Sequence, residues 1–327
     1  MLRDSFGRQI TDLRLSVTDR CNFKCVYCKP QLEGRWVQRS KLLTFEELER
    51  VARILVSMGI EKIRITGGEP LVRQNIEQLI ARIARIEGIR DLCMTTNGYV
   101  LAEKGDALRR AGLRRVTISL DTLNAEKFTA ITGKDYFARV LEGIDAAVAL
   151  GFQPVKVNAV IMRDVNDDEL IAFARFAREK NVVFRFIEFM PLDADHQWSK
   201  NRVVTLDEMV EKISSYEKLV PLPAHSISET ARRFQFEDGV GEIGIIAPVS
   251  RPFCGHCSRI RMTADGKIRT CLFSILEHDV RALLRGGGSD DAIKGFIEQV
   301  VDQKEERHHI NDPDFVQPER DMSLIGG

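Results

Sequence analysis

Residues 21–28 read Cys-Asn-Phe-Lys-Cys-Val-Tyr-Cys, which sets three thiols at the spacing C-x3-C-x2-C. Thiolates at this density suit soft metals and iron–sulfur clusters. Residues 13–18, just before them, alternate apolar and polar side chains, which predicts a half-buried strand. The cysteines would then lie on a loop leaving a strand, where α/β barrels place their chemistry. A zinc site with a distant fourth ligand, or buried free thiols, is the alternative.

The following segments alternate between strand-like and helix-like patterns, which predicts parallel βαβ units with right-handed crossovers. Strands are expected at residues 12–18, 62–66, 91–95, 115–120, 155–162 and 182–190. Helices are expected at residues 45–58, 74–86, 101–111, 138–150 and 167–180. Six units predict an incomplete TIM-type (β/α)6 barrel. An open doubly wound sheet is the alternative, but its glycine fingerprint is missing after the first strand.

Five of the expected strands devote one face to polar residues, although strands covered on both faces usually read as continuous apolar runs. If the helices cover the apolar faces, the polar faces line a water-filled interior of the barrel, here called the lumen. Strand periodicity assigns the following residues to that lumen: Arg14, Arg64, Thr95, Ser119 and Lys156. The alternative is that these faces simply meet solvent. Cys93 lies within a strand and is expected to be a buried, inert thiol.

Beyond Met190 the barrel pattern stops. Residues 191–203 are expected to form a loop, with helices at 206–215 and 290–303, and short strands at 230–236, 242–247, 259–263 and 267–270. This predicts a small C-terminal α+β domain, residues 226–327, closing the open side of a barrel formed by residues 1–225. The tail from 304 onward is expected to be mobile when free.

The C-terminal segment holds a second thiol set, formed by Cys254, Cys257 and Cys271. On spacing alone, structural zinc with His256 or His278 as fourth ligand is favoured. Arg259 and Arg261 would share one strand face beside this set, and guanidinium groups suit phosphate oxygens.

Composition limits the function further. The 327 residues contain 48 Lys and Arg against 48 Asp and Glu, so no overall field favours nucleic acid or a membrane surface. No apolar run is long enough to cross a bilayer, and residues 1–11 lack a signal-peptide core, so a cytoplasmic protein is expected. Seven cysteines without a secretion signal argue against a disulfide framework.

Four features in order along the chain together resemble one known family. The first thiol set, with Tyr27 before its third cysteine, resembles the radical S-adenosylmethionine (SAM) signature. Residues 65–70, Ile-Thr-Gly-Gly-Glu-Pro, resemble the GGEP segment of that superfamily. With the second thiol set and the final Gly326-Gly327, the chain resembles the molybdenum cofactor biosynthesis protein A family of GTP 3′,8-cyclases.

The resemblance implies two 4Fe–4S clusters, SAM and a set of site residues. The first cluster would be held by Cys21, Cys25 and Cys28, and the second, which meets the substrate base, by Cys254, Cys257 and Cys271. The implied SAM contacts are Tyr27, Gly68, Ser119 and Met190. The implied GTP contacts are Arg14, Arg64, Thr95, Lys156, Arg259, Ile260 and Arg261. The implied catalytic positions are Arg14, Arg259, Arg261, Gly326 and Gly327, with the tail inserting toward the site. Arg185 has the opposite strand parity to Met190, so a bulge would be needed to bring it to the phosphates.

The resemblance implies that the protein is a lyase. SAM is split into methionine and a 5′-deoxyadenosyl radical, which removes hydrogen from the ribose C3′ of GTP, and the carbon radical attacks C8 of guanine. The implied partners are GTP, an electron donor and the next enzyme of the molybdopterin pathway, with a homodimer left open. Two other functions remain as alternatives: a two-cluster radical enzyme acting on a peptide or RNA, and a non-enzymatic iron–sulfur or zinc protein.

Overall fold

The computed structural model describes residues 1–28, 36–193 and 198–326. The strands of these residues form one sheet, ordered β12-β11-β10-β1-β2-β3-β4-β5-β6-β9-β8-β7. Their bounds are β1 Asp12–Ser16, β2 Lys62–Thr66, β3 Asp91–Thr96, β4 Arg115–Ser119, β5 Lys156–Ile161, β6 Val183–Glu188, β7 Leu219–Leu222, β8 Ala231–Phe236, β9 Glu242–Ile246, β10 Arg259–Met262, β11 Lys267–Arg269 and β12 His278–Asp279.

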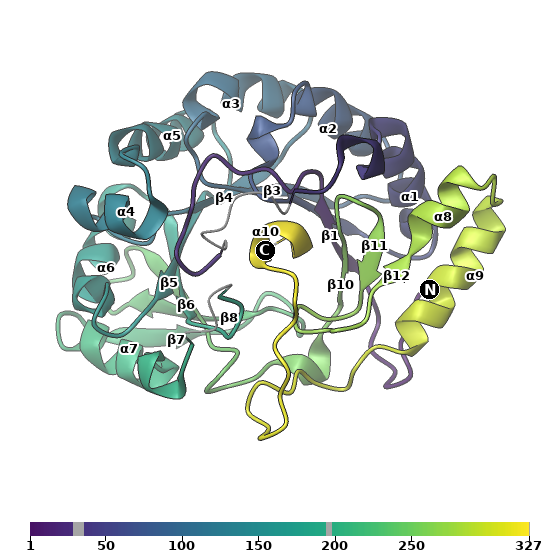
Figure 1. The fold of residues 1–327 in the computed structure, drawn as a ribbon. Coiled ribbons are helices and arrows are strands. Elements are labelled where there is room, and N and C mark those ends of the chain that lie inside the picture. The colour runs from purple at the N-terminus through teal and green to yellow at the C-terminus, as the bar shows by residue number, and fades with distance from the viewer. Residues whose placement is uncertain (29–35, 194–197, 327) are drawn as a thin grey trace.

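Helices cover the outer side of this curved sheet (Figure 1). The α-helices are α1 Phe45–Ser57, α2 Ile76–Ala84, α3 Leu101–Arg110, α4 Ala125–Thr132, α5 Phe137–Ala149, α6 Leu170–Glu179, α7 Leu206–Ser214, α8 Val280–Arg285, α9 Asp290–Asp302 and α10 Met322–Ile325. Short 3-10 turns occur at Arg39–Lys41, Pro70–Val72, Asp167–Glu169, Lys200–Arg202 and Cys254–His256.

The six expected units are present, because β1 to β6 pair in parallel in chain order. The C-terminal segment adds one parallel strand at each end of that run. β9 pairs with β6, and β10 pairs with β1. Beyond β9 the sheet continues with antiparallel β8 and then β7, and beyond β10 it continues with antiparallel β11 and then β12. The fold is therefore a partial α/β barrel whose sheet continues into a C-terminal antiparallel extension.

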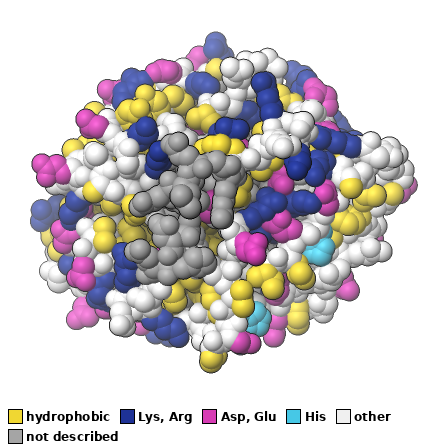
Figure 2. All heavy atoms as spheres, in the orientation of Figure 1, with side chains coloured by type: hydrophobic (Ala, Val, Ile, Leu, Met, Phe, Trp, Pro, Cys, Tyr) yellow, Lys and Arg dark blue, Asp and Glu magenta, His cyan; other side chains and the backbone are white. Residues whose placement is uncertain are grey.

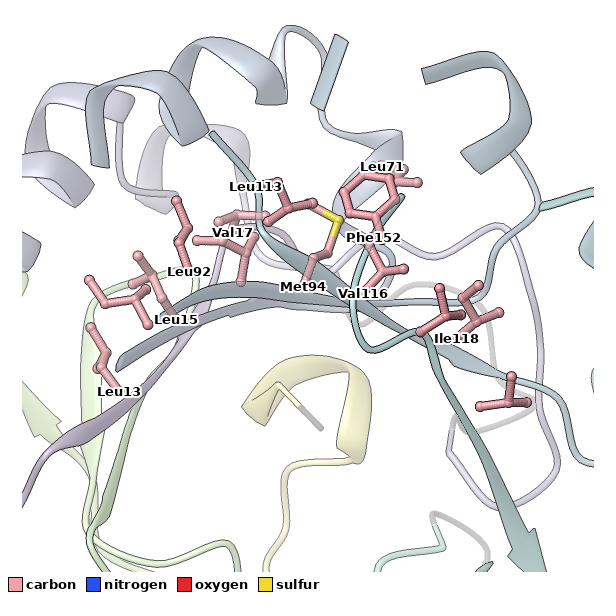
Figure 3. Packing of buried hydrophobic residues seen from close by; sticks show 14 of the residues in the cluster. Leu13, Leu15, Val17, Leu71, Leu92, Met94, Leu113, Val116, Ile118 and Phe152 are labelled. Atoms are coloured by element: carbon pink, nitrogen blue, oxygen red, sulfur yellow. The ribbon is translucent and has the colours of Figure 1, made fainter. Parts of the chain in front are cut away.

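The apolar face of the barrel strands packs against the helices, as the alternation predicted. Leu13, Leu15, Met94, Val116 and Ile118 are fully buried or nearly so. Figure 3 shows these side chains on the helix side of the strands, with α10 on the opposite side. The polar faces are thereby turned into the barrel.

The helix boundaries follow local capping chemistry. Thr44 caps α1 by accepting a hydrogen bond from the backbone N–H of Glu47, whose side chain accepts one from the N–H of Thr44. This reciprocal box satisfies two free amide groups of the first turn. Thr205 and Glu208 repeat the arrangement at α7. Helices α4, α8 and α10 and strands β7 and β12 were absent from the sequence expectation because they are short and weakly periodic.

The expectation of a mobile tail was wrong for the part of it that the structure describes. Helix α10 lies inside the barrel mouth, where the C-terminus sits in Figure 1. Asp321, Ser323 and Ile325 are buried, and Ile325 packs with Leu192, Phe273 and Ile310. A few apolar and capping residues therefore anchor a segment whose composition is otherwise polar. Gly327 lies outside the described residues, as do residues 194–197 of the expected 191–203 loop.

The surface carries both charges in mixture, in line with the balanced composition (Figure 2). Across the described ranges, no helix combines the length and apolar character needed to cross a membrane.

Candidate functional site

The barrel encloses a cavity of about 640 Å³. Both cysteine sets line it, and so do the polar strand residues predicted for the lumen. The expected site residues found on its wall are Cys21, Cys25, Cys28, Cys254, Cys257, Cys271, Tyr27, Gly68, Ser119, Met190, Arg14, Arg64, Thr95, Lys156, Arg259 and Arg261. The fold thus brings together groups that are up to about 250 residues apart in sequence.

The first cysteine set lies on the loop after β1, and the turn after β2 holds that loop in place. A Cβ added to Gly67 would come within 2.4 Å of the Thr18 carbonyl oxygen, and one added to Gly68 within 2.4 Å of the Arg20 carbonyl oxygen. The backbone N–H of Gly68 donates a 2.8 Å hydrogen bond to that Thr18 oxygen. Only glycines allow this approach, and the residues they hold lead directly into Cys21.

Tyr27 fastens the same loop to the barrel wall. Its hydroxyl donates a 2.5 Å hydrogen bond to Oδ2 of Asp121, which follows β4. The other carboxylate oxygen, Oδ1, accepts from the backbone N–H of Val160 in β5. Burial raises the pKa of Asp121 to about 6, while the Tyr27 and Val160 hydrogen bonds oppose that rise. The strand alternation that predicts Ser119 for the lumen extends to Asp121, but sequence analysis assigned no role to this carboxylate.

Glu69 is a second buried carboxyl group that lines the site and to which sequence analysis assigned no role. It accepts hydrogen bonds from the hydroxyl of Thr96 and the backbone N–H groups of Leu71 and Asn97. Burial raises its pKa to about 7, against the pull of these donors. The carboxyl thereby joins the turn after β2 to the end of β3 and fixes the cavity wall beside the first cysteine set.

Three guanidinium-bearing residues form a row across neighbouring strands. Arg14 in β1 is in register with Arg261 in β10 on one side and Arg64 in β2 on the other. Neighbouring strands are about 4.8 Å apart, so these like charges are close. Arg64 donates to the hydroxyls of Thr95 and Thr117, whereas Nε of Arg14 is buried without a hydrogen-bond partner among the described residues. A row of this kind is suited to an anion with several oxygens.

The pKa shifts reflect this crowding of positive charge. Burial lowers the pKa of Arg14, and the neighbouring guanidinium of Arg64 lowers it further. The pKa of Lys156 falls to about 8, first through burial and then through the charges of Arg185 and Arg115. Buried cations that destabilise each other in the free protein gain from a polyanionic ligand, and such perturbed groups mark functional sites.

One expectation about an individual strand residue needs correction, and the GTP contact expected of Ile260 stays a prediction that its backbone would have to meet. Arg185 lines the cavity together with Met190, and its Nε donates a 2.9 Å hydrogen bond to Asn158. No bulge is required, because β6 ends at Glu188 and strand parity no longer applies at Met190. Ile260 has its side chain in the hydrophobic core and not on the cavity wall, because it alternates with Arg259 and Arg261. Cys93 is fully buried, as expected.

The second cysteine set lies at the aromatic end of the cavity, near Phe253 and Phe273. Arg259 donates to the Cys257 sulfur from Nε and Nη2, at 3.4 and 3.3 Å. Burial raises the pKa of the Cys257 thiol, but the positive charges of Arg259 and Lys304 outweigh burial and lower this pKa to about 7. This thiol is therefore prepared to act as a thiolate ligand. His256 and His278, the alternative fourth ligands, do not line the cavity.

Two further residues near this set come from the tail and were missed by sequence reasoning. Lys304 is buried and donates from Nζ to the Thr270 carbonyl oxygen. His308 is 8% exposed and lines the cavity. Arg8 fixes this region, since its guanidinium donates to the carbonyl oxygens of Cys254, Glu305 and Glu306. Composition gave no signal for these roles, because the segment is polar.

Each of the two cysteine sets presents three thiols to the cavity. Three thiols are a donor set that fits an iron–sulfur cluster in which one iron is left for another ligand. Within the described part of the chain, no three His, Cys, Asp or Glu side chains converge so as to hold one metal ion. Ligands of a cluster bind different iron atoms, so convergence on one point is not required of them.

Comparison with known proteins adds to this geometry. Residues 15–177 match the model for the radical SAM superfamily, and residues 182–310 match Molybdenum Cofactor Synthesis C. A protein from Rhodopirellula baltica called GTP 3′,8-cyclase is 46% identical over 330 residues, covering 100% of this chain and 92% of its own length. A protein of the same name from Acidothermus cellulolyticus is 45% identical, covering 92% of this chain and 84% of its own.

Among solved structures, SuiB of Streptococcus suis bound to the precursor peptide SuiA has a similar fold. The TM-score is 0.64 at 15% sequence identity, over 89% of this chain and 67% of that one. At this identity the likeness concerns the fold alone.

Proposed function

This chain belongs to the GTP 3′,8-cyclase family of the radical SAM superfamily, a lyase family of molybdenum cofactor biosynthesis, and we propose that the barrel cavity is where it cyclises GTP. The observation that carries this proposal is the shared cavity. Two cysteine sets line one cavity together with a row of arginines from β10, β1 and β2.

A 4Fe–4S cluster and SAM accompany membership of the superfamily. Cys21, Cys25 and Cys28 are the residues that would hold this cluster, while Tyr27, Gly68, Ser119 and Met190 would contact SAM. When bound, the two groups supply the radical that removes hydrogen from the ribose C3′ of GTP. The chain supplies placement: Gly68 and Tyr27 join the first cysteine loop to the turn after β2 and to β4.

The substrate is held by charge. Arg14, Arg64, Lys156 and Arg261, joined by Arg185, bind the triphosphate in this proposal, and Thr95 supports Arg64 through its hydroxyl. Charge-assisted contacts of buried guanidinium groups both orient the nucleotide and relieve the repulsion among them. Catalysis then depends on orientation and on exclusion of water from a reactive radical. Attack at C8 leaves a nucleotide radical, which must take up one electron from the electron donor and one proton to give the cyclised product.

The second cysteine set is proposed to hold a second 4Fe–4S cluster, with Cys254, Cys257 and Cys271 as ligands. Arg259 lies at the Cys257 sulfur, so it supports that set directly and faces the substrate from there. An electron donor for the first cluster and the next enzyme of the molybdopterin pathway are the proposed partners.

The test is a chemical analysis of protein prepared without oxygen, followed by turnover. About eight iron atoms per chain are expected for two clusters, whereas about four, with zinc, would refute the second one. The reduced protein should convert GTP and SAM to the 3′,8-cyclised nucleotide and 5′-deoxyadenosine. Deoxyadenosine formation that GTP does not stimulate, with no cyclised product, would refute the assignment of this cavity.

A further inference from the structure

Lys304 is a buried cation that the proposed function does not use. Only 3% of its surface is exposed, and it does not belong to the described lining of the cavity. Its Nζ donates to the carbonyl oxygen of Thr270, which is an uncharged partner. No carboxylate of the described residues forms an ion pair with it, although a lysine is almost never buried without an opposite charge.

The neighbouring carboxylate, that of Glu305, is engaged elsewhere. Its Oε2 accepts a 2.7 Å hydrogen bond from the hydroxyl of Thr270, whereas Lys304 is bonded to the carbonyl oxygen of the same residue. The two opposite charges therefore meet Thr270 at different atoms. Glu305 is also partly exposed, so water screens its charge, while the charge of Lys304 is enclosed by protein.

Thr270 places Lys304 beside the second cysteine set, because it directly precedes Cys271 in the chain. Burial raises the pKa of Cys271, and the charge of Lys304 is the largest influence that opposes this rise. Burial acts in the same direction on Cys254 and Cys257, and Lys304 is again among the cations that oppose it. The charge of one lysine therefore acts on all three thiols from behind the cavity wall.

The segment that carries Lys304 is fixed in this position. Its own backbone N–H donates a 3.0 Å hydrogen bond to the carbonyl oxygen of Val301, at the end of α9. Arg8 donates to the carbonyl oxygens of Glu305 and Glu306 and also to that of Cys254. One guanidinium group thus joins the lysine segment to the second cysteine set, and the ammonium group cannot easily turn toward solvent.

We propose that Lys304 is the counter-ion of the second cluster, which it helps to retain and makes easier to reduce; this rests on the proposed ligand role of Cys254, Cys257 and Cys271. A cluster held by three thiolates carries net negative charge, and reduction adds one more. A fixed, buried positive charge therefore favours both binding of the cluster and its reduced form. Because Lys304 does not line the cavity, it acts through the cluster and not by contact with GTP.

The experiment measures the reduction potential of the second cluster in the full-length Cys25→Ala chain, where the first cluster is expected to be absent. Reduction with titanium(III) citrate is followed by electron paramagnetic resonance. Lys304→Met, Lys304→Arg and Glu305→Met are compared in this background. Lys294→Met is the matched control for the loss of one positive charge, because Lys294 is a partly exposed residue of α9 that pairs with Asp291.

Lys304→Met should lower the ratio of reduced to oxidised cluster at a fixed potential about tenfold or more, a shift of about 59 mV or more toward lower potential. Lys304→Arg and the Lys294→Met control should stay within about twofold. Glu305→Met should shift the potential in the opposite direction, although it too removes a side-chain bond to Thr270. An unshifted potential in Lys304→Met, or shifts of the same sign in Lys304→Met and Glu305→Met, would overturn the inference.

A second measurement covers the case in which Lys304→Met loses its cluster. Without iron the ammonium group has no counter-charge, so the cluster-free variant should resist unfolding by urea at least as well as the cluster-free parent chain. Unfolding at lower urea would indicate a merely structural lysine and would also overturn the inference. If the second set binds no iron even with Lys304 in place, the proposed second cluster fails, and the inference fails with it.

The two failures are therefore distinguishable. Iron bound at the second set together with a potential that ignores Lys304 removes the counter-ion and leaves the proposed function standing. Absence of iron from that set, with Lys304 unchanged, removes the proposed function of the set itself.

Discussion

Arg261 donates a 2.5 Å hydrogen bond from Nη1 to the carbonyl oxygen of Gly326, which joins β10 to the C-terminal tail inside the barrel. The same glycine packs against the neighbouring strands β1 and β2. A Cβ added to it would lie 3.0 Å from Cγ2 of Thr66 and 3.1 Å from Cβ of Ser16, and its φ is +75°. The end of the tail is therefore fitted between β1, β2 and β10, beside the row of arginines.

The first prediction follows from this fit. Deleting Gly326 and Gly327 should leave iron content and GTP binding near normal, while cyclised product falls sharply. The reason is that Arg261 loses a partner that orients it for the substrate. Product and uncoupled 5′-deoxyadenosine are measured together. A wild-type yield of product would show that the tail has no part in the reaction.

Gly326→Ala provides a more conservative version of that change. It keeps the chain length but combines left-handed backbone strain with a close Cβ contact. We expect a smaller loss of product than with the deletion. Gly287→Ala, at φ +77° with open space around the added Cβ, is the control for strain alone.

The second prediction concerns Cys25. Cys25→Ala should abolish 5′-deoxyadenosine formation under reducing, anaerobic conditions, because three thiolates are needed to hold the first cluster. Cys93→Ala is the matched control, since that thiol is buried outside the cavity. Undiminished SAM cleavage by Cys25→Ala would remove the first cysteine set from the mechanism.

The third prediction separates the two cysteine sets. Cys257→Ala should retain the iron of the first set but lose GTP binding and cyclised product. Iron analysis and GTP binding are measured on one preparation. Unchanged GTP affinity after loss of iron from the second set would contradict a role for that set in binding substrate.

The fourth prediction concerns the arginine row. Arg64→Ala should weaken GTP binding about tenfold or more and guanosine binding far less, because a charge-assisted contact contributes about 1.5–3 kcal/mol. Arg53→Ala, on the exposed face of α1 beside Glu49, is the control. Equal losses for GTP and guanosine would place Arg64 away from the phosphates.

The fifth prediction is a pH dependence of GTP affinity. Lys156 has a pKa of about 8 in the free protein, and a bound triphosphate raises it. Binding above pH 8 therefore takes up a proton, so affinity falls as pH rises through 8, by up to about tenfold per unit. Lys156→Met should bind GTP more weakly at pH 7 and lose this component of the dependence. An identical pH profile in that variant would exclude Lys156.

Sequence reasoning reached the barrel and most of its lining because both depend on local periodicity. Arg14, Arg64, Thr95, Ser119 and Lys156 alternate with apolar neighbours, and alternation fixes the face of a strand. The register that sets Arg261, Arg14 and Arg64 in a row could not be predicted, since it arises from pairing between strands far apart in the chain.

The remaining site groups were missed for a different physical reason. Glu69 acts from a turn beyond a strand end, where periodicity ends, and Asp121 continues the polar face of its strand but had no assigned role. His308 and Lys304 belong to a polar segment without a strong pattern, and they are buried only because the tail is anchored by Ile325 and its neighbours. Their positions follow from tertiary packing, which composition does not report.

The pairing of C-terminal strands with both ends of the β1–β6 run has a consequence for how the newly made protein matures. Strands β1 and β6 each receive a neighbour from the C-terminal segment, and Asp12 pairs with Arg259 across most of the chain length. Until the ribosome has released that segment, both strands are bare edges, which invite pairing with other chains. Assembly that waits on such distant pairing is slow and open to aggregation. A C-terminally truncated chain should accordingly be a poor folding unit, recovered mainly in inclusion bodies or bound to chaperones.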